Sequence, residues 1–225
     1  GLGLPEDQQL EDSEKIHRIL RLIDRESDLR KSADGQFEVI DGNIKIEGEF
    51  VPQVIAKRIL DFMDRKYNFE PLVKFWKNLR NNPSERSRNE LLSFLEHNGI
   101  PITDDGYFVA YKYVNSDFSA CHDRTFKNHP GNVLSMDRSA VDADSSQTCS
   151  RGLHVAAWGY VSGQGTIVSV KVNPVDVVSI PYDYNGQKMR VCRYMVLDTV
   201  SGEFNEPRFT DEPKVELDRE RFEYL

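Results

Sequence analysis

The sequence predicts an α+β fold: a helical N-terminal half that contains a β-hairpin, followed by a mainly antiparallel β domain. Apolar residues recur with the period of a helix up to about residue 98, and with the two-residue period of a strand from residue 100 onward. The acids change at the same point, because every acid between Glu96 and Glu203 is Asp, and Glu favours helices whereas Asp favours turns. We therefore expect a mostly helical region over 1–98, a β-rich domain over 99–200 and an acidic C-terminal arm over 201–225.

The first region is expected to contain four helices and one hairpin. Amphipathic spacing predicts helices over 12–30 and 54–66, and alternating apolar residues around an Asp-Gly turn predict a hairpin over 36–47. Another helix is expected to open at Glu70, because the Pro that follows fits a first helical turn. Ser84 is expected to cap the last helix, which ends at Gly99.

The second region is expected to be a set of strands joined by turns. Alternation predicts strands over 107–114, 152–158, 166–172, 175–180 and 189–196. The connection over 115–150 has few apolar residues, and a connection of that length with little regular structure is often functional. The arm over 201–225 contains Pro207 and Pro213 among many acids, so we expect it to be dispensable for folding.

Composition restricts the classes of partner. The 225 residues have a formal net charge of −8 and a pI near 5.2, so there is no overall positive field and nucleic acid is not the default partner. No run of about 18 apolar residues predicts a membrane span, and the N-terminus does not resemble a secretion signal. The three cysteines are far apart, which is not the pattern of a disulfide framework and favours a reducing cytoplasm.

Three residues of the second region are candidate catalytic residues, namely His122, Cys149 and His154. Thiolate and imidazole are zinc ligands, but these residues, with Cys192, lack the short paired spacing of a structural site, so we expect no metal and no cofactor. A Cys149 nucleophile activated by one of the histidines is also conceivable chemically, although no neighbouring signature supports it. A thiol in a β domain is more often a small buried apolar residue.

Two functional hypotheses follow from the residues. A fold-level analogy with ADP-ribosyltransferase-like domains would make this a nucleotide-binding or enzyme domain centred on the three candidates, but the region lacks the Glu that such a catalytic acid would need. A non-enzymatic interaction protein is therefore favoured. Convergence of His122, His154 and either Lys188 or Arg190 on one cavity would favour the enzyme instead. Candidate binding residues are the cations Arg124, Lys127, Arg138, Lys188 and Arg190.

Several segments, which follow one another along the chain, indicate a family far more specifically than these patterns do. They are Asp104 to Phe108, Cys121-His122 with Thr125-Phe126 and Pro130-Gly131, Gln147 to Val155, Val170 to Pro181, and Asp183 to Asn185 with Lys188 to Arg190. Together they resemble the rapid-lysis B family of the rII locus of T-even bacteriophages. Weaker matches upstream extend the resemblance to about four fifths of the chain.

The resemblance implies a phage early protein that delays lysis and protects the infection from exclusion by a resident prophage or from host defence. Its implied partner is a companion rapid-lysis A-type protein or a host defence factor. The implied location is the host cytoplasm, with peripheral association at the inner membrane through the partner. No catalytic residue is carried over from the family.

Overall fold

The computed structural model describes residues 14–15, 37–40, 43–161, 165–182 and 186–200. The chain divides into two compact units, Gly1–Asn68 and Phe69–Leu225, and each is described by itself. The expected acidic arm over 201–225 lies outside the described residues, as does the expected helix over 12–30 except for Glu14 and Lys15, which are helical.

The first unit holds a small antiparallel sheet and one described long helix. Strand β1 (Phe37–Ile40) pairs with β2 (Asn43–Ile46), which pairs with β3 (Glu49–Phe50), so the predicted hairpin is confirmed. Helix α2 (Gln53–Asp64) follows, close to the predicted range. Its buried face carries Ile55 and Ile59 at the spacing of one helical turn, the spacing from which the helix was predicted.

The second unit opens with two helices, α3 (Glu70–Arg80) and α4 (Glu85–His97). Pro71 lies in the first turn of α3, as expected. Ser84 caps α4, because its side-chain oxygen accepts a hydrogen bond from the Ser87 backbone N–H at 3.1 Å. Both helices bury their apolar stripe, which includes Phe75, Leu79 and Leu91.

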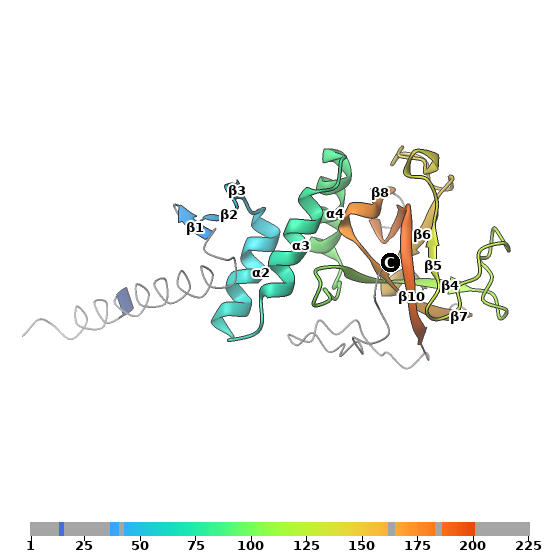
Figure 1. The fold of residues 1–225 in the computed structure, drawn as a ribbon, viewed down its shortest axis with the longest axis horizontal. Helices are drawn as coiled ribbons and strands as arrows, with labels where there is room; N and C mark the ends of the chain where they lie inside the picture. Colours follow the sequence, from blue (N-terminus) through green and yellow to red (C-terminus); the bar gives the residue numbers. More distant parts are fainter. Residues whose placement is uncertain (1–13, 16–36, 41–42, 162–164, 183–185, 201–225) are drawn as a thin grey trace, which may run out of the picture. The chain divides into compact units, whose positions relative to one another are not determined.

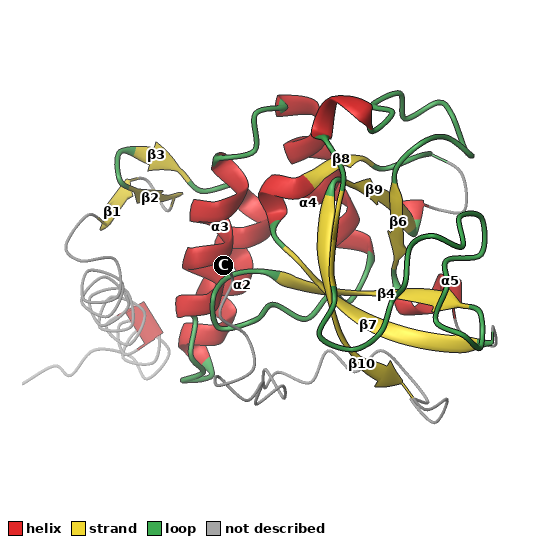
Figure 2. Cartoon of the chain, turned by 45° about the vertical axis from the view of Figure 1, so that its right-hand side comes forward, coloured by secondary structure: helices red, strands yellow, loops and turns green. Residues whose placement is uncertain are grey.

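The core of this unit is a seven-stranded sheet in which every neighbouring pair is antiparallel, in the order β5-β10-β7-β4-β6-β9-β8 (Figure 1). The strands are β4 (Phe108–Val114), β5 (Val133–Ser135), β6 (Leu153–Ala156), β7 (Thr166–Val172), β8 (Val177–Ser179), β9 (Lys188–Val191) and β10 (Arg193–Val200). Short helices are η1 (Arg138–Ala140), α5 (Trp158–Val161) and η2 (Pro174–Asp176). The α+β fold class is confirmed, and α4 packs beside β8 (Figure 2).

The structure differs from the sequence prediction where one strand was expected over 189–196. It contains two strands that separate at Cys192, β9 beside β6 and β8, and β10 between β5 and β7. Cys192 leaves both ladders, because its N–H donates to the Asp176 carbonyl and its own carbonyl accepts from the Met136 N–H, each at 2.9 Å. The chain therefore turns from one part of the sheet to another at this residue, which alternation of apolar residues does not reveal.

Close contact with α3 fixes the start of β4. Gly106 has a φ of +77°, and a Cβ at this position would lie 2.4 Å from the backbone of Lys74 and Phe75. The Asn78 amide donates to the carbonyls of Asp105 and Gly106, both at 3.1 Å. This loop thereby sets the position of the strand that carries one wall of the candidate site.

Helix α4 is bonded to the last strands of the sheet. The Ser87 hydroxyl donates to the Val178 carbonyl at 2.6 Å, and the Glu90 carboxylate accepts from the Ile180 N–H at 2.8 Å. The composition boundary at 98/99 therefore marks a change of secondary structure inside the second unit. As a domain boundary it stays a prediction.

Candidate functional site

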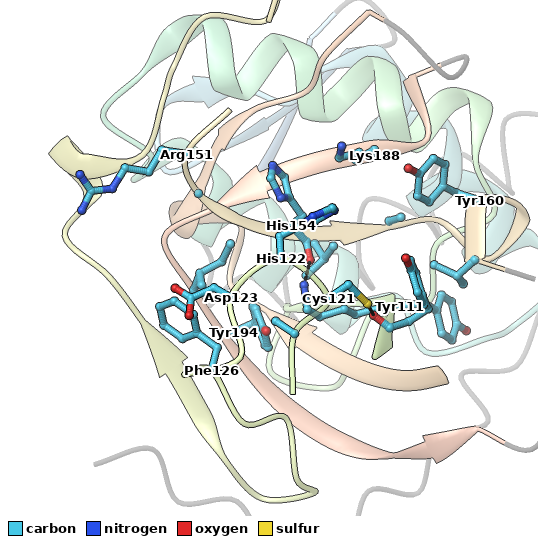
Figure 3. Close-up of a pocket in the computed structure, with 18 of the residues that line it drawn as sticks. Tyr111, Cys121, His122, Asp123, Phe126, Arg151, His154, Tyr160, Lys188 and Tyr194 are labelled. Atoms are coloured by element: carbon cyan, nitrogen blue, oxygen red, sulfur yellow. Dashed lines mark hydrogen bonds between the residues drawn. The ribbon is translucent and has the colours of Figure 1, made fainter. Parts of the chain in front are cut away.

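A cavity of about 460 Å³ opens in the second unit, within the size range of small-molecule sites. Its walls come from β4, the loop after β4, β6, α5, β9 and β10 (Figure 3). The residues that give it chemical character are Tyr111, Lys112, His122, His154, Tyr160 and Lys188. Polar and aromatic side chains thus meet in one hollow although they come from segments that are distant in the sequence.

His154 of β6 contributes a neutral imidazole. Its Nε2 is buried and has no hydrogen-bond partner in the described part of the chain. Burial, followed by the positive charges of Lys188 and Lys112, lowers its pKa to about 3. A buried ring nitrogen without a partner is costly, so a ligand group that bonds to it would gain free energy.

Two lysines flank this imidazole electrostatically. The Lys112 ammonium donates to the His154 carbonyl at 2.9 Å, and burial lowers the pKa of Lys112 to about 8. The Lys188 ammonium donates to the Thr148 carbonyl at 3.3 Å, and the residue is 8% exposed. Arg151, which is exposed, adds a further cationic group at the rim, and the exposed imidazole of His122 lies in the lining as well.

Negative charge is scarce in the cavity. Among the described lining residues the single carboxylate is that of Asp123. That carboxylate already accepts hydrogen bonds from the Thr125 N–H at 3.0 Å and from the Thr125 hydroxyl at 2.6 Å. The cavity therefore carries an excess of positive charge in a chain whose net charge is −8.

Aromatic rings form the other part of the wall. The Tyr111 ring meets Trp158 edge-on with a centroid distance of 5.2 Å, and burial raises the pKa of Tyr111. Tyr111 and Tyr160 pack against the apolar cluster of Ala156, Val161 and Ile167. The cluster fixes these rings, so they offer a rigid apolar surface beside the cations.

The structure brings together two of the three predicted catalytic candidates. His122 and His154 both line the cavity, and Lys188 joins them. Cys149 is exposed and is not among the lining residues, so the structure does not place its thiol beside either imidazole. A different thiol, that of Cys121, lines the cavity instead.

The predicted binding cations divide into two groups. Arg138 donates to the carbonyls of Val175 and Val177 at 2.7 and 2.8 Å. Arg190 is fully buried and donates to the carbonyls of Gln147 and Asp144. These two guanidinium groups hold loops to the sheet, whereas Arg124 and Lys127 are exposed on the 115–150 connection.

The 115–150 connection is ordered by a repeated local turn. In Asp-x-Ser or Asp-x-Thr segments the carboxylate accepts hydrogen bonds from the N–H and the hydroxyl two residues later. The four segments begin at Asp117, Asp123, Asp137 and Asp144. These turns explain why the region uses Asp throughout and Glu nowhere.

Sequence reasoning missed Lys112, Tyr111 and Tyr160 as site residues. Lys112 stands between two tyrosines in a strand whose remaining members are apolar, and a lone cation at such a place is a signal. Its partner, the His154 carbonyl, is 42 residues away. The pairing of β4 with β6 therefore had to be known before the signal could be interpreted.

Comparison with known proteins decides the family. The model of the family described as Bacteriophage T4 protein rIIB matches residues 9–207. The chain belongs to the rIIB family. Protein rIIB of Enterobacteria phage T4 is 40% identical over 196 residues, which are 85% of this chain and 63% of that relative, so this rIIB-family chain spans less than two thirds of the relative's length. No solved structure matches it significantly.

In the described ranges no helix has both the length and the hydropathy to cross a bilayer. Within the same ranges no three His, Cys, Asp or Glu residues are grouped so that they could hold a metal ion.

Proposed function

We propose that this rIIB-family protein acts in lysis inhibition, and in protection against prophage exclusion or host defence, by binding a protein partner rather than by catalysis. The proposed partners are a companion rapid-lysis A-type phage protein and a host defence factor. The proposed location is the host cytoplasm, with peripheral association at the inner membrane through the partner. Family membership is the observation that carries the proposal.

The convergence of His122, His154 and Lys188 on one cavity favours the enzyme hypothesis, but other features of the cavity favour binding. The thiol of Cys149 lies outside the cavity, and the single carboxylate among the described lining residues, that of Asp123, is engaged by Thr125. A nucleophile with an adjacent base, or a general acid with a raised pKa, would favour catalysis. Cys121 lines the cavity with His122 and His154, but its thiol donates to the Tyr113 carbonyl at 3.9 Å rather than to an imidazole.

The surface proposed to meet the partner is the start of the 115–150 connection. Main-chain hydrogen bonds close it: Asn128 N–H donates to the Phe118 carbonyl at 2.7 Å and Ala120 N–H to the Phe126 carbonyl at 2.9 Å. Arg124 is exposed between these closures. A loop that is ordered before binding loses little conformational entropy when it binds, which suits recognition.

Charge reversal of Arg124 tests the proposal. Phages that carry Arg124→Glu are expected to lyse early, and the variant should capture the companion rapid-lysis A-type protein at least about tenfold less tightly, because a repulsive charge replaces an attractive one. Lys57→Glu is the matched control, since Lys57 is an exposed cation of the first unit. Full lysis delay and full capture by Arg124→Glu would remove this surface from the mechanism. Circular dichroism confirms that both variants are folded.

A further inference from the structure

We infer that the cavity between β4, β6, β9 and α5 is a binding site for a mononucleotide-class ligand, a phosphate attached to a ribose and a planar base. The phosphate would lie by Lys112, Lys188 and His154, and the base by the tyrosine rings. The loop after β4 carries the proposed partner surface and also forms one wall of this cavity, but the inference does not depend on that surface.

The excess of positive charge in the cavity favours an anionic ligand. Lys112, Lys188 and Arg151 line the cavity, and the one carboxylate among the described lining residues is already bonded to Thr125. Like charges in a partly desolvated hollow repel one another, and an entering phosphate relieves that repulsion through charge-assisted hydrogen bonds. His154, whose buried Nε2 has no hydrogen-bond partner in the described part of the chain, lines the same cavity.

The tyrosine rings and the volume of the cavity favour a ligand that carries a planar base in addition to the phosphate. Tyr111 and Tyr160 are packed against an apolar cluster, so they present fixed aromatic surface on which a base can stack. A cavity of about 460 Å³ has room for a nucleoside monophosphate, whereas a bare phosphate would leave most of it unfilled. The combination of cations with rings therefore selects a phosphate that carries a planar group.

Lys112 supplies a measurable signature. Its pKa of about 8 follows from burial, with Cys121 raising the pKa and Lys188 lowering it. The other titratable or charged groups that line the cavity are His122, Asp123, Arg151, His154 and the tyrosines Tyr111, Tyr113, Tyr160 and Tyr194. A bound phosphate stabilises the charged ammonium, so binding at pH 8 should take up a fraction of a proton.

Isothermal titration calorimetry on the full chain tests the inference. The probes are the four ribonucleoside 5′-monophosphates, adenosine and inorganic phosphate. At least one monophosphate is expected to bind at least tenfold more tightly than either adenosine or phosphate. The inference is overturned if none of the monophosphates binds, or if adenosine or inorganic phosphate binds as tightly as the best monophosphate.

A pair of lysine variants localises the ligand. Lys112→Met is expected to weaken binding at least about tenfold, because one charge-assisted contact is lost. Lys74→Met is the matched control, since the Lys74 ammonium also donates to a backbone carbonyl, that of Asp104 at 3.0 Å, but lies outside the cavity lining. Equal weakening by both variants would overturn the site.

The proton signature keeps the test decisive if Lys112→Met does not fold. The wild-type titration is repeated at pH 8 in two buffers with different ionisation enthalpies. A difference in the observed heat that corresponds to proton uptake supports the contact with Lys112. Identical heats would overturn it.

Discussion

Asn82 holds the junction of α3 and α4 to the segment formed by η2 and β8. Its buried side chain donates to the carbonyls of Pro174 and Val177 at 2.9 and 2.8 Å. Its oxygen accepts from the Ser84 N–H and from Arg138, each at 3.0 Å. One amide thus satisfies four polar groups in the core, where an unsatisfied group is costly.

Truncation of this amide should be strongly destabilising. Asn82→Ala is expected to lower the free energy of unfolding by about 2–4 kcal/mol, because it leaves buried partners unsatisfied. Urea unfolding followed by circular dichroism measures the change. The neighbouring Asn81→Ala, at an exposed position, should change stability by less than about 0.5 kcal/mol. Similar effects of the two variants would show that the hydrogen bonds of Asn82 contribute little.

The backbone of α3 lies so close to Gly106 that a larger residue there should be destabilising. Gly106→Ala introduces both an unfavourable positive φ and a clash with the backbone of α3, and we expect a loss of about 2–4 kcal/mol in the free energy of unfolding. Gly131→Ala is the control, because Gly131 has a φ of +87° and open space around a Cβ. A loss no larger than that of the control would mean that the clash is relieved by a small backbone shift.

At the scale of elements, the Asp turns make the 115–150 connection sensitive to acid. Hydrogen bonds from Ser and Thr lower the pKa of Asp123, Asp137 and Asp144. A carboxyl whose pKa is lower in the folded than in the unfolded chain contributes stability above its unfolded pKa and loses it as the pH falls through the folded value.

Acid should therefore loosen this connection first. We expect the free energy of unfolding to fall as the pH drops below about 4, the ordinary pKa of Asp. The double variant Asp123→Asn with Asp137→Asn keeps an acceptor oxygen but does not titrate, so its stability should depend less on pH between about 4 and 2. Chemical unfolding at several pH values measures this slope. An unchanged slope would show that these turns do not couple to global stability.

The helices and the hairpin were predictable because their signals are local. Pro71 and Ser84 mark helix starts within one turn of the residues they affect. The role of Asn82 was not predictable, since its carbonyl partners lie 92 and 95 residues away. The division of the predicted strand at Cys192 depends likewise on Asp176 and Met136, which its own neighbours do not specify.

The candidate site was predictable in part for the same reason. Residue type alone identified His122 and His154, because few side chains can serve as bases near neutral pH. Lys112 required the strand order, and the exclusion of Cys149 required the path of its loop. The types of side chain in a sequence suggest which reactions or contacts are possible. Which of those side chains meet in one cavity depends on how the strands of the sheet pair.

At the scale of the whole molecule, α3 and α4 form one compact unit with the sheet. Arg86 adds to the bonds of α4, because its guanidinium donates to the Ala143 carbonyl and lies 3.6 Å from Glu90. Leu91, Phe94 and Leu95 of the same helix are buried. Removing these helices would expose apolar surface and leave polar groups of β8 without partners.

This arrangement predicts which fragment folds. Residues 69–200 are expected to unfold cooperatively on heating, whereas residues 99–200 should lack a cooperative transition, because they lose the helices that cover β8. Thermal circular dichroism of the two fragments decides between a domain boundary at 68/69 and one at 98/99. A cooperative transition in 99–200 would instead establish the boundary that the change of composition indicated.

The turn at Cys192 gives the molecule a built-in reporter of its own opening. Burial, followed by Asp176, raises the pKa of Cys192 to about 11, so almost no thiolate exists at neutral pH, and the side chain is 8% exposed. Cys149, in contrast, is exposed. With the half-buried Cys121 replaced by Ser, a thiol reagent should therefore modify Cys149 at once and Cys192 only when the junction between β9 and β10 opens. The slow phase of labelling then measures how often these two strands open at Cys192.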